Sequence, residues 1–348
     1  MRKRLLYIIM MFSLTALFWS CERRPLLELT NQTTVRVLIK MNTILNVTTG
    51  IYNEYIPKPD ITPNVIRVMF YDPETKELLN QGFVSQKGVD ADGNEYIEGQ
   101  VSIRPGTYDV LCYNFDTPST IVENENNMHD IMAYTSEISE ALYGRFGSRN
   151  EMTIKPKVYY EPDHLLVARE EKIEVPEHTE LLVINMEAFS VVDSYYIQIR
   201  LKNGKYASDA TALLTDLSPS NRIGLNKRTD DEYAATFFEM HRSKNPAGRA
   251  EEQEVLCAVF NTFGKRPDDI DPSVESQLFV TFNVITTEGK VVEMTMDMDE
   301  IFLSEDAQKR HWLLIDKVFE IPVPETSGSG FQPGVGEWDE EHGTVEIK

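Results

Sequence analysis

The side chains that could carry chemistry are few and widely scattered along the chain. None of the six histidines lies near another at the spacing of metal ligands, and three cysteines are too few for a disulfide framework or a four-cysteine zinc site. The sequence contains no HExxH, GxSxG or CxxC motif and no glycine-rich phosphate loop. Carboxylates are plentiful, but no pair stands out by context. The sequence therefore predicts a protein that is not an enzyme and has no catalytic residues, metal site or cofactor.

Two acidic segments imitate ligand loops. Residues 90–94 (DADGN) look like the start of a calcium loop, but an EF-hand needs glycine and glutamate where this chain has Glu95 and Val101. A hairpin turn is the favoured interpretation. Residues 161–164 (EPDH) combine oxygen and nitrogen ligands, and here an interdomain loop is favoured. Cys112 and Cys257 lie in apolar runs and are expected to be buried free thiols.

Cys21 has the most specific context of any reactive side chain. Residues 2–4 are basic, and the fifteen residues 5–19 (LLYIIMMFSLTALFW) are almost wholly apolar, which is too short for an ordinary membrane span and fits a secretory signal. Phe18, Ser20 and then Cys21 resemble a bacterial lipobox, in which cleavage precedes the cysteine and its thiol receives diacylglycerol. We expect residues 1–20 to be a lipoprotein signal peptide and Cys21 to be lipidated. An ordinary signal peptide with an incidental cysteine is the alternative.

The charge of the chain limits its partners. With 34 Lys and Arg residues against 56 Asp and Glu residues, the formal net charge is −22. Such a surface repels phosphate backbones, which excludes non-specific nucleic-acid binding, and it disfavours peripheral docking on anionic lipid. Hydrophobic residues make up 41% of the chain, which is enough for real cores, and the length of 348 residues suggests about two domains.

Most of the chain shows the alternating or β-branched runs of strands. The residues between 107 and 115 are apolar on both faces, so Tyr108, Val110, Leu111 and Cys112 are expected to be buried in one core. Leu256, Cys257 and Phe260 are expected in another. One helix is predicted over residues 128–144, where apolar side chains recur at a spacing of three to four. The predicted strands are residues 33–40, 64–71, 79–85, 94–103, 107–115, 181–186, 194–201, 254–263, 277–286, 291–298 and 312–319.

Strands without regular intervening helices favour an all-β fold. We predict two tandem antiparallel β-sandwiches, transthyretin-like or Ig-like, with one or two short helices. The predicted domains are residues 21–175 and 176–325, with the joint expected near residues 168–176, a charged stretch that ends in proline. Residues 109–117 (DVLCYNFDT) and 254–262 (EVLCAVFNT) are identical at five of nine positions, which suggests equivalent strands in two related domains, chance similarity being the alternative.

The C-terminal segment, residues 326–348, differs from the domains in kind. It begins with a flexible linker composition, TSGSG, and ends in a strand pattern. Val345 and Ile347 alternate with polar residues and could seat in a partner's groove, while Trp338 could fill a further pocket. The alternative is a strand that folds back onto its own domain. The candidate partner-binding residues are Trp338, Thr344, Val345, Glu346 and Ile347.

These features together resemble the Bacteroidales fimbrillin-like lipoproteins. The resemblance rests on the lipobox-like end at Cys21, the turn and strand of residues 105–114 (PGTYDVLCYN), the two-sandwich layout and the tail that ends in residues 344–347 (TVEI). It implies transthyretin-like domains and a surface-exposed location on the outer membrane through a lipid anchor. It also implies assembly with other fimbrial subunits by strand addition, in which a cut at a basic residue removes the first strand of a shaft subunit and a neighbour's terminal strand fills the groove.

The sequence departs from the shaft pattern after its first predicted strand. No arginine lies between Arg36 and Arg67, and Arg36 itself falls inside the strand, although Lys40 and Lys58 remain. An uncut subunit keeps its groove filled by its own strand, which favours an anchor or accessory subunit. The alternative function is a glycan-binding surface lipoprotein of a polysaccharide uptake system, with Trp312, Trp338 and residues 159–160 as candidate aromatics. A host or glycan ligand stays open.

Overall fold

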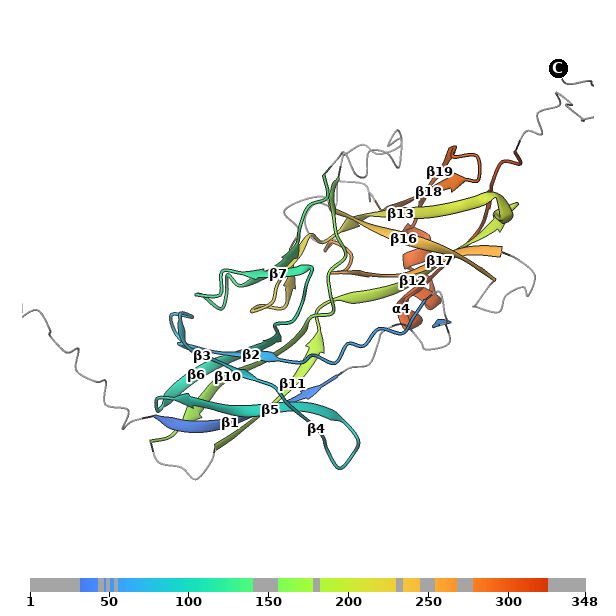
Figure 1. The fold of residues 1–348 in the computed structure, drawn as a ribbon. Helices are drawn as coiled ribbons and strands as arrows, with labels where there is room; N and C mark the ends of the chain where they lie inside the picture. The colour runs from blue at the N-terminus through green and yellow to red at the C-terminus, as the bar shows by residue number, and fades with distance from the viewer. Residues whose placement is uncertain are drawn as a thin grey trace, which may run out of the picture.

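The chain forms two large curled β-sheets in succession, with a small sheet between them (Figure 1). The computed structural model describes residues 32–42, 47, 51–52, 56–139, 156–177, 182–229, 234–244, 254–267 and 278–324. The predicted signal peptide and C-terminal segment lie outside these ranges. Each predicted strand coincides with an observed one, so the all-β prediction is confirmed.

The first sheet has eight strands in the order β3-β2-β6-β10-β11-β1-β5-β4. All its neighbouring strands are antiparallel except β1 and β11, which are parallel. The strands are β1 (Thr33–Met41), β2 (Ile66–Tyr71), β3 (Leu78–Val84), β4 (Gln86–Val89), β5 (Glu95–Ile103), β6 (Gly106–Asn114), β10 (Leu166–Val175) and β11 (Leu182–Ser190).

The second sheet has the order β19-β18-β13-β16-β17-β12-β20, and β9 pairs in addition with β16. The ladders of β12 with β20 and of β9 with β16 are parallel, so the prediction of wholly antiparallel sheets is wrong at these places and at β1–β11. The elements are β9 (Lys157–Tyr159), β12 (Asp193–Lys202), β13 (Ala207–Leu217), β16 (Ala234–Lys244), β17 (Glu254–Thr262), β18 (Phe279–Thr286), β19 (Val291–Asp297), α3 (Asp299–Phe302), α4 (Glu305–Arg310) and β20 (Trp312–Glu320).

The small sheet joins segments from the two halves of the chain. Its order is β15-β14-β8-β7, with β7 (Thr120–Glu123) and β8 (Met132–Thr135) from the first half, and β14 (Ser220–Arg222) and β15 (Lys227–Arg228) from the second. The helix predicted over residues 128–144 is therefore wrong where the structure describes it. Alternate residues of β8 are buried, with Ala133 and Thr135 inward, because tertiary pairing with β7 and β14 decides the conformation there.

Each large sheet curls around its own core. In the first sheet, side chains from β1, β2, β5, β6, β10 and β11 meet in one cluster, although β2 and β5 are far apart in the strand order. The sheet must therefore bend, as a single curled layer rather than two separate ones. A methyl group at Gly82 of β3 would lie 2.9 Å from a methyl of Val101 on β5, which shows how closely the two halves approach.

The two large sheets follow the same path. In each sheet, the first strand along the chain pairs in parallel with the last strand, β1 with β11 and β12 with β20. On its other side the first strand pairs antiparallel with a later strand, β1 with β5 and β12 with β17. The second strand, β2 or β13, pairs with β3 or β16 on one side and β6 or β18 on the other. Because β16 also pairs with β17, it takes the places of both β3 and β4. The prediction of two related domains agrees with this repeat.

The pairing bears on three details of the predicted organisation. Residues 109–117 and 254–262 do not form equivalent strands, because β17 takes the place of β5 and β18 that of β6. Residues 168–176, read as a charged joint, lie mostly in β10. The change of sheet comes between β11 and β12, because β11 pairs with β1 and β10 of the first sheet, and the domain bounds at residues 175 and 176 stay predictions.

Candidate assembly site

The residues predicted to carry function lie outside the described residues. This holds for the lipidation site Cys21 and for the candidate partner-binding residues Trp338, Thr344, Val345, Glu346 and Ile347. These roles stay predictions. The structure does describe the first strand, whose retention or loss decides what kind of fimbrial subunit the resemblance implies.

Strand β1 is fully embedded in the first sheet. It pairs along most of its length with β11 on one side and β5 on the other. Val35, Val37 and Ile39 have no exposed surface and belong to the core of the first sheet. Removing β1 would open a groove between β5 and β11 and expose this core, so the first domain is complete only with β1 in place.

The outward face of β1 carries its basic residues in ion pairs. Arg36 Nε donates to a carboxylate oxygen of Glu98 at 2.8 Å, and Lys40 Nζ lies 3.1 Å from a carboxylate oxygen of Asp90. Hydrogen bonds from the backbone and side chain of Asn94 lower the pKa of Asp90 to about 2. Lys58 is exposed in the connection from β1 to β2. Three basic residues could in principle direct a cut near the end of the first strand. Two of them, Arg36 and Lys40, are thus held in ion pairs within the sheet.

A second cluster of side chains locks the two halves of the molecule together. Tyr71, Leu111 and Tyr113 on the outer face of the first sheet pack with Ile131 near β8 and Ile223 near β14. Gly224 lies so close to this packing that a Cβ atom would be 1.7 Å from the carbonyl oxygen of Met128. The joint between the sheets is therefore a packed core and not a loose linker.

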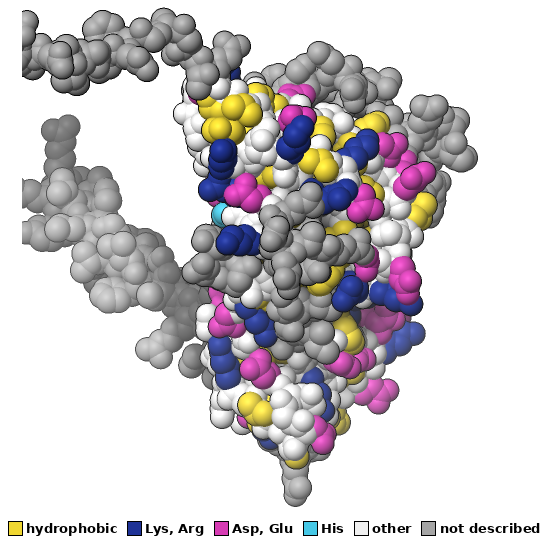
Figure 2. Space-filling view, turned by 90° about the vertical axis from the view of Figure 1, so that its right-hand side faces the viewer, with side chains coloured by type: hydrophobic (Ala, Val, Ile, Leu, Met, Phe, Trp, Pro, Cys, Tyr) yellow, Lys and Arg dark blue, Asp and Glu magenta, His cyan; other side chains and the backbone are white. Residues whose placement is uncertain are grey.

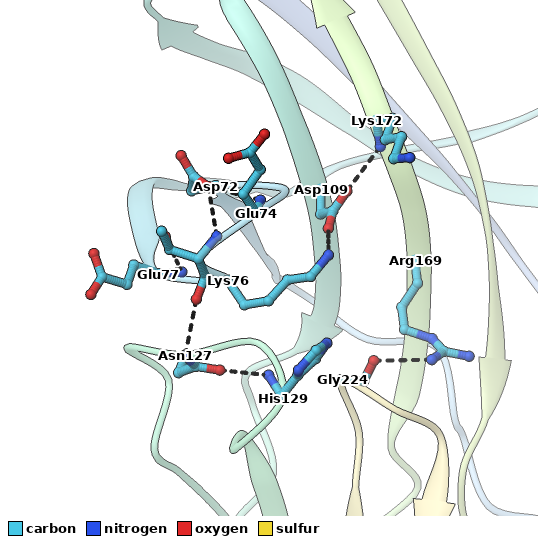
Figure 3. A network of polar contacts seen from close by, with 11 residues as sticks. Asp72, Glu74, Lys76, Glu77, Asp109, Asn127, His129, Arg169, Lys172 and Gly224 are labelled. Carbon is cyan, nitrogen blue, oxygen red and sulfur yellow. Dashed lines mark hydrogen bonds and ion pairs between the residues drawn. The ribbon is translucent and has the colours of Figure 1, made fainter.

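A buried ion pair lies within the first sheet, close to this joint (Figure 3). The carboxylate of Asp109, which is 1% exposed, accepts hydrogen bonds from Lys76 Nζ at 2.5 Å and from the backbone N–H of Lys172 at 2.9 Å. Lys172 has a positive φ of 56° at the bulge of β10, which points its N–H at the carboxylate. Arg169, also on β10, donates to the carbonyl of Gly224 at 3.0 Å. These contacts tie β6, β10 and the small sheet into one unit.

Two cavities border the joint, the first mainly polar and the second mainly apolar. One, of about 340 Å³, lies among residues 60–64, 114, 116–118, 163–164 and 261, and the other, of about 270 Å³, shares His164 and Asn261 with it. Nearby, the carboxylate of Glu161 accepts the backbone N–H of Asn261 at 2.8 Å, and burial raises its pKa to about 7. Burial also lowers the pKa of His164. Residues 161–164 thus lie between the two sheets, which agrees with the prediction that they form an interdomain loop.

Of the predicted aromatic residues that the structure describes, Tyr160 is exposed and Tyr159 is partly buried, so these residues do not form a platform of two or more exposed rings. Trp312 is 8% exposed and packs in a core, and Trp338 lies outside the described residues. Two exposed aromatic rings do meet elsewhere: Phe83 and Phe115 lie 5.5 Å apart, but they are tilted by 59°, and the Arg67 guanidinium lies over both. On the face seen in Figure 2, acidic and basic side chains are interspersed. A tilted pair of rings is a poor stacking surface for a sugar.

The remaining reactive groups are structural. Cys112 and Cys257 are buried and form no disulfide bond, as predicted. Burial raises the pKa of both thiols, that of Cys257 to about 11. Within the described ranges, no three His, Cys, Asp or Glu side chains gather as metal ligands would. The same residues include no helix that is long and apolar enough to span a membrane.

Comparison with protein families decides where the chain belongs. The family model described as "Domain of unknown function (DUF5119)" matches residues 20–239, which is more than half of the sequence. The chain belongs to this DUF5119 family. Its first sheet, its small sheet and the first strands of its second sheet all fall within the matched region.

Individual relatives of this DUF5119 chain have fimbrial and adhesin descriptions. A Bacteroides ovatus protein named "Putative fimbrium anchoring subunit Fim4B" is 23% identical over 246 residues, which cover 70% of this chain and 67% of the relative. A crystal structure of a "putative adhesin" from Bacteroides ovatus superposes with a TM-score of 0.53 at 20% identity, covering 84% of this chain and 94% of that one, and so shares the fold. The fimbrial anchor protein Mfa2 from Porphyromonas gingivalis follows at a TM-score of 0.43 and 12% identity, covering 81% and 88%. None of these descriptions is of an enzyme.

Sequence reasoning missed the joint. Lys76, Asp109 and Gly224 come from separate segments and form no motif. One signal was available: Asp109 is a carboxylate inside a run of otherwise apolar residues in β6, and a charge in such a strand requires a buried partner.

Proposed function

We propose that this protein is a fimbrial anchor or accessory subunit, held by a lipid on Cys21 at the outer membrane and exposed at the cell surface. The observation that carries the fimbrial assignment is the similarity to the Bacteroides ovatus fimbrium anchoring subunit, which extends over 70% of this chain. Membership of the DUF5119 family and the fold shared with an adhesin structure support it.

Strand β1 supports an anchor rather than a shaft subunit. A shaft subunit would need to lose β1 to open an acceptor groove, but here the strand is embedded on both edges and its core face is fully buried. Arg36 and Lys40, the basic residues within it, are paired with Glu98 and Asp90. An uncut first domain does not accept a strand there, as suits the subunit that ends the fimbria at the membrane.

The C-terminal segment is proposed to reach the partner subunit. The chain leaves the second sheet after Ile321, and the linker of residues 326–330 allows residues 331–348 to extend. Val345 and Ile347 would seat in the partner's groove, Thr344 and Glu346 would face outward, and Trp338 would fill a further pocket.

Deleting residues 331–348 tests this role. The truncated protein should keep both sheets folded, with an unfolding midpoint within a few degrees of the full chain, while cells release fimbriae into the medium. Cys21→Ala should release fimbriae as well, but by moving the whole protein from the membrane into the soluble fraction. If the truncation instead lowers stability by several kcal/mol, residues 331–348 are a strand of their own domain and the donor role fails.

The alternative, a glycan-binding lipoprotein, would need a stacking surface. Among the described residues, the exposed aromatic pair Phe83 and Phe115 is tilted and covered by Arg67, which does not favour it.

A further inference from the structure

The connection between β1 and β2 belongs to the first sheet by sequence but packs on the second. Figure 1 shows the segment before β2 running towards the second sheet. Three clamp residues in this connection, Val47, Ile51 and Ile56, are at most 5% exposed. They form one hydrophobic cluster with side chains of β12, β17 and β20. The connection is therefore held by both sheets.

The second sheet is apolar on both faces where the clamp residues cover it. Alternate residues of β12, β17 and β20 point into the core of the second sheet, and the residues between them point to the opposite face. On that opposite face, the cluster is formed by Tyr196, Val255, Cys257 and Trp312, none of which is more than 8% exposed. Loss of the clamp residues would expose this apolar surface to water, which is unfavourable.

The corresponding face of the first sheet is polar. In the repeated strand path, β1, β5 and β11 take the places of β12, β17 and β20. Their outward residues include Arg36 and Lys40 on β1, which form ion pairs with Glu98 and Asp90. An apolar outer face is thus a feature of the second sheet and not of the repeated fold, and it matches the apolar clamp residues.

The position of the basic residue in the connection gives this packing a consequence. Lys58 is the only Lys or Arg between Met41 and Arg67, and it is exposed. It comes after all three clamp residues in the chain. A cut at Lys58 would therefore leave β1 and the clamp residues on the same fragment. That fragment would be held by the ladders of β1 with β5 and β11 and, in addition, by the cluster on the second sheet.

We propose that the second sheet clamps the connection between β1 and β2 through Val47, Ile51 and Ile56, so that a cut at Lys58 does not release β1 from the molecule. The consequence for assembly rests on the proposed function, because an anchor has to keep the strand that a shaft subunit loses. The second domain thereby takes part in keeping the first sheet closed.

A single cut after Lys58 tests the clamp. A recognition site for a sequence-specific protease is inserted between Lys58 and Pro59, because insertions are tolerated best in exposed connections. The full mature chain is cut there, and mass spectrometry identifies the two fragments. The expected result is that both fragments elute together in gel filtration without denaturant. Separate elution would overturn the proposal.

The Ile51→Ala variant separates the clamp from the strand ladders. Ile51 has no exposed surface and lies in the cluster, so its truncation should speed release of the fragment from the cut chain at least about tenfold at a fixed urea concentration. Gln32→Ala truncates an exposed side chain just before β1 on the same fragment, and it should change the release rate by less than about twofold. Equal release rates for Ile51→Ala and the unsubstituted cut chain would overturn the clamp.

A second variant covers the case in which Ile51→Ala does not fold, as judged by its unfolding transition. Val47 is 1% exposed in the same cluster, and Val47→Ala removes fewer atoms. This variant should speed release of the fragment at least about threefold. An unchanged rate would contradict the contribution of the connection to holding β1.

The remaining outcomes separate the inference from the proposed function. The release measurements use the purified chain alone and do not depend on a fimbrial partner. If the cut chain loses its fragment while cells with the uncut chain keep their fimbriae, the clamp is overturned and the anchor role stands. If cells that lack the protein keep their fimbriae, the proposed function fails, while joint elution and faster release by Ile51→Ala would still establish the clamp.

Discussion

The two large sheets have the same strand path but differ at one seam. The first closes through the ladder between β10 and β11, and its first strand is covered on both edges. The second ends in β19 and β20, with α3 and α4 in the connection between them. Among the described strands, the repeated fold therefore keeps its pairing order while one copy closes through a ladder that the other copy lacks.

The largest effect is expected from disrupting the closed sheet at β1. Val37 has no exposed surface and lies in the core of the first sheet. Val37→Asp would bury a carboxylate without a partner and should lower the free energy of unfolding by more than about 4 kcal/mol. Chemical denaturation monitored by circular dichroism measures it.

The neighbouring residue provides the control for β1. Arg36 faces outward in a pair with Glu98, and its side chain is 37% exposed, so Arg36→Ala should cost less than about 1 kcal/mol. Similar losses for the two variants would mean that β1 does not complete the core of the first sheet.

A smaller loss is expected from breaking the buried ion pair of the first sheet. Asp109→Ala removes a buried carboxylate and leaves Lys76 Nζ and the N–H of Lys172 without their acceptor, which should cost about 3 kcal/mol. The double variant Asp109→Ala with Lys76→Met should recover part of this loss, because no unpaired cation then remains. Thermal unfolding of the wild type, the two single variants Asp109→Ala and Lys76→Met, and the double variant measures the coupling energy between the two residues. Strictly additive losses would show that the ion pair does not couple the two segments.

The smallest expected effect concerns pH. The folded-state pKa of Glu161, about 7, lies above its ordinary value of 4.5. Between these two pH values the folded state therefore binds more protons than the unfolded state. The contribution to stability is therefore present below about pH 4.5 and is lost as the pH rises through about 7. Relative to Glu161→Gln, which cannot ionise, the wild type should lose about 2 kcal/mol between pH 5 and pH 8. Parallel pH profiles for the two proteins would show that Glu161 is not held in its protonated form.

Local patterns in the sequence identified strands more readily than their partners. Residues 107–115 are apolar on both faces because β6 is covered by one core on each side, and this was predictable from the sequence. Strand β13 shows no alternation, because Ala210 to Leu217 are all buried, so period-2 reasoning missed it. The parallel pairing of β11 with β1 leaves no local mark in the sequence, which is why the pairing partner of β11 could not be predicted.

The candidate sites were predictable to a different degree. Cys21 and the tail residues are marked by sequence context, so they could be predicted but lie outside the described residues. The place of β19 at one end of the second sheet could not be predicted, because among the described strands this place is defined by pairing with β18 alone and not by the residues of β19. Val292 and Met294 look like ordinary core residues until β18 and β20 are placed around them.

The intact mass of the chain that copurifies with detergent-extracted fimbriae tests the central claim most directly. An anchor that keeps its first domain closed predicts a single form that begins at Cys21, carries acyl chains there and still contains residues 33–41. A form that begins after Met41 would mean that β1 has been removed, and it would contradict both the anchor role and the closure of the first sheet.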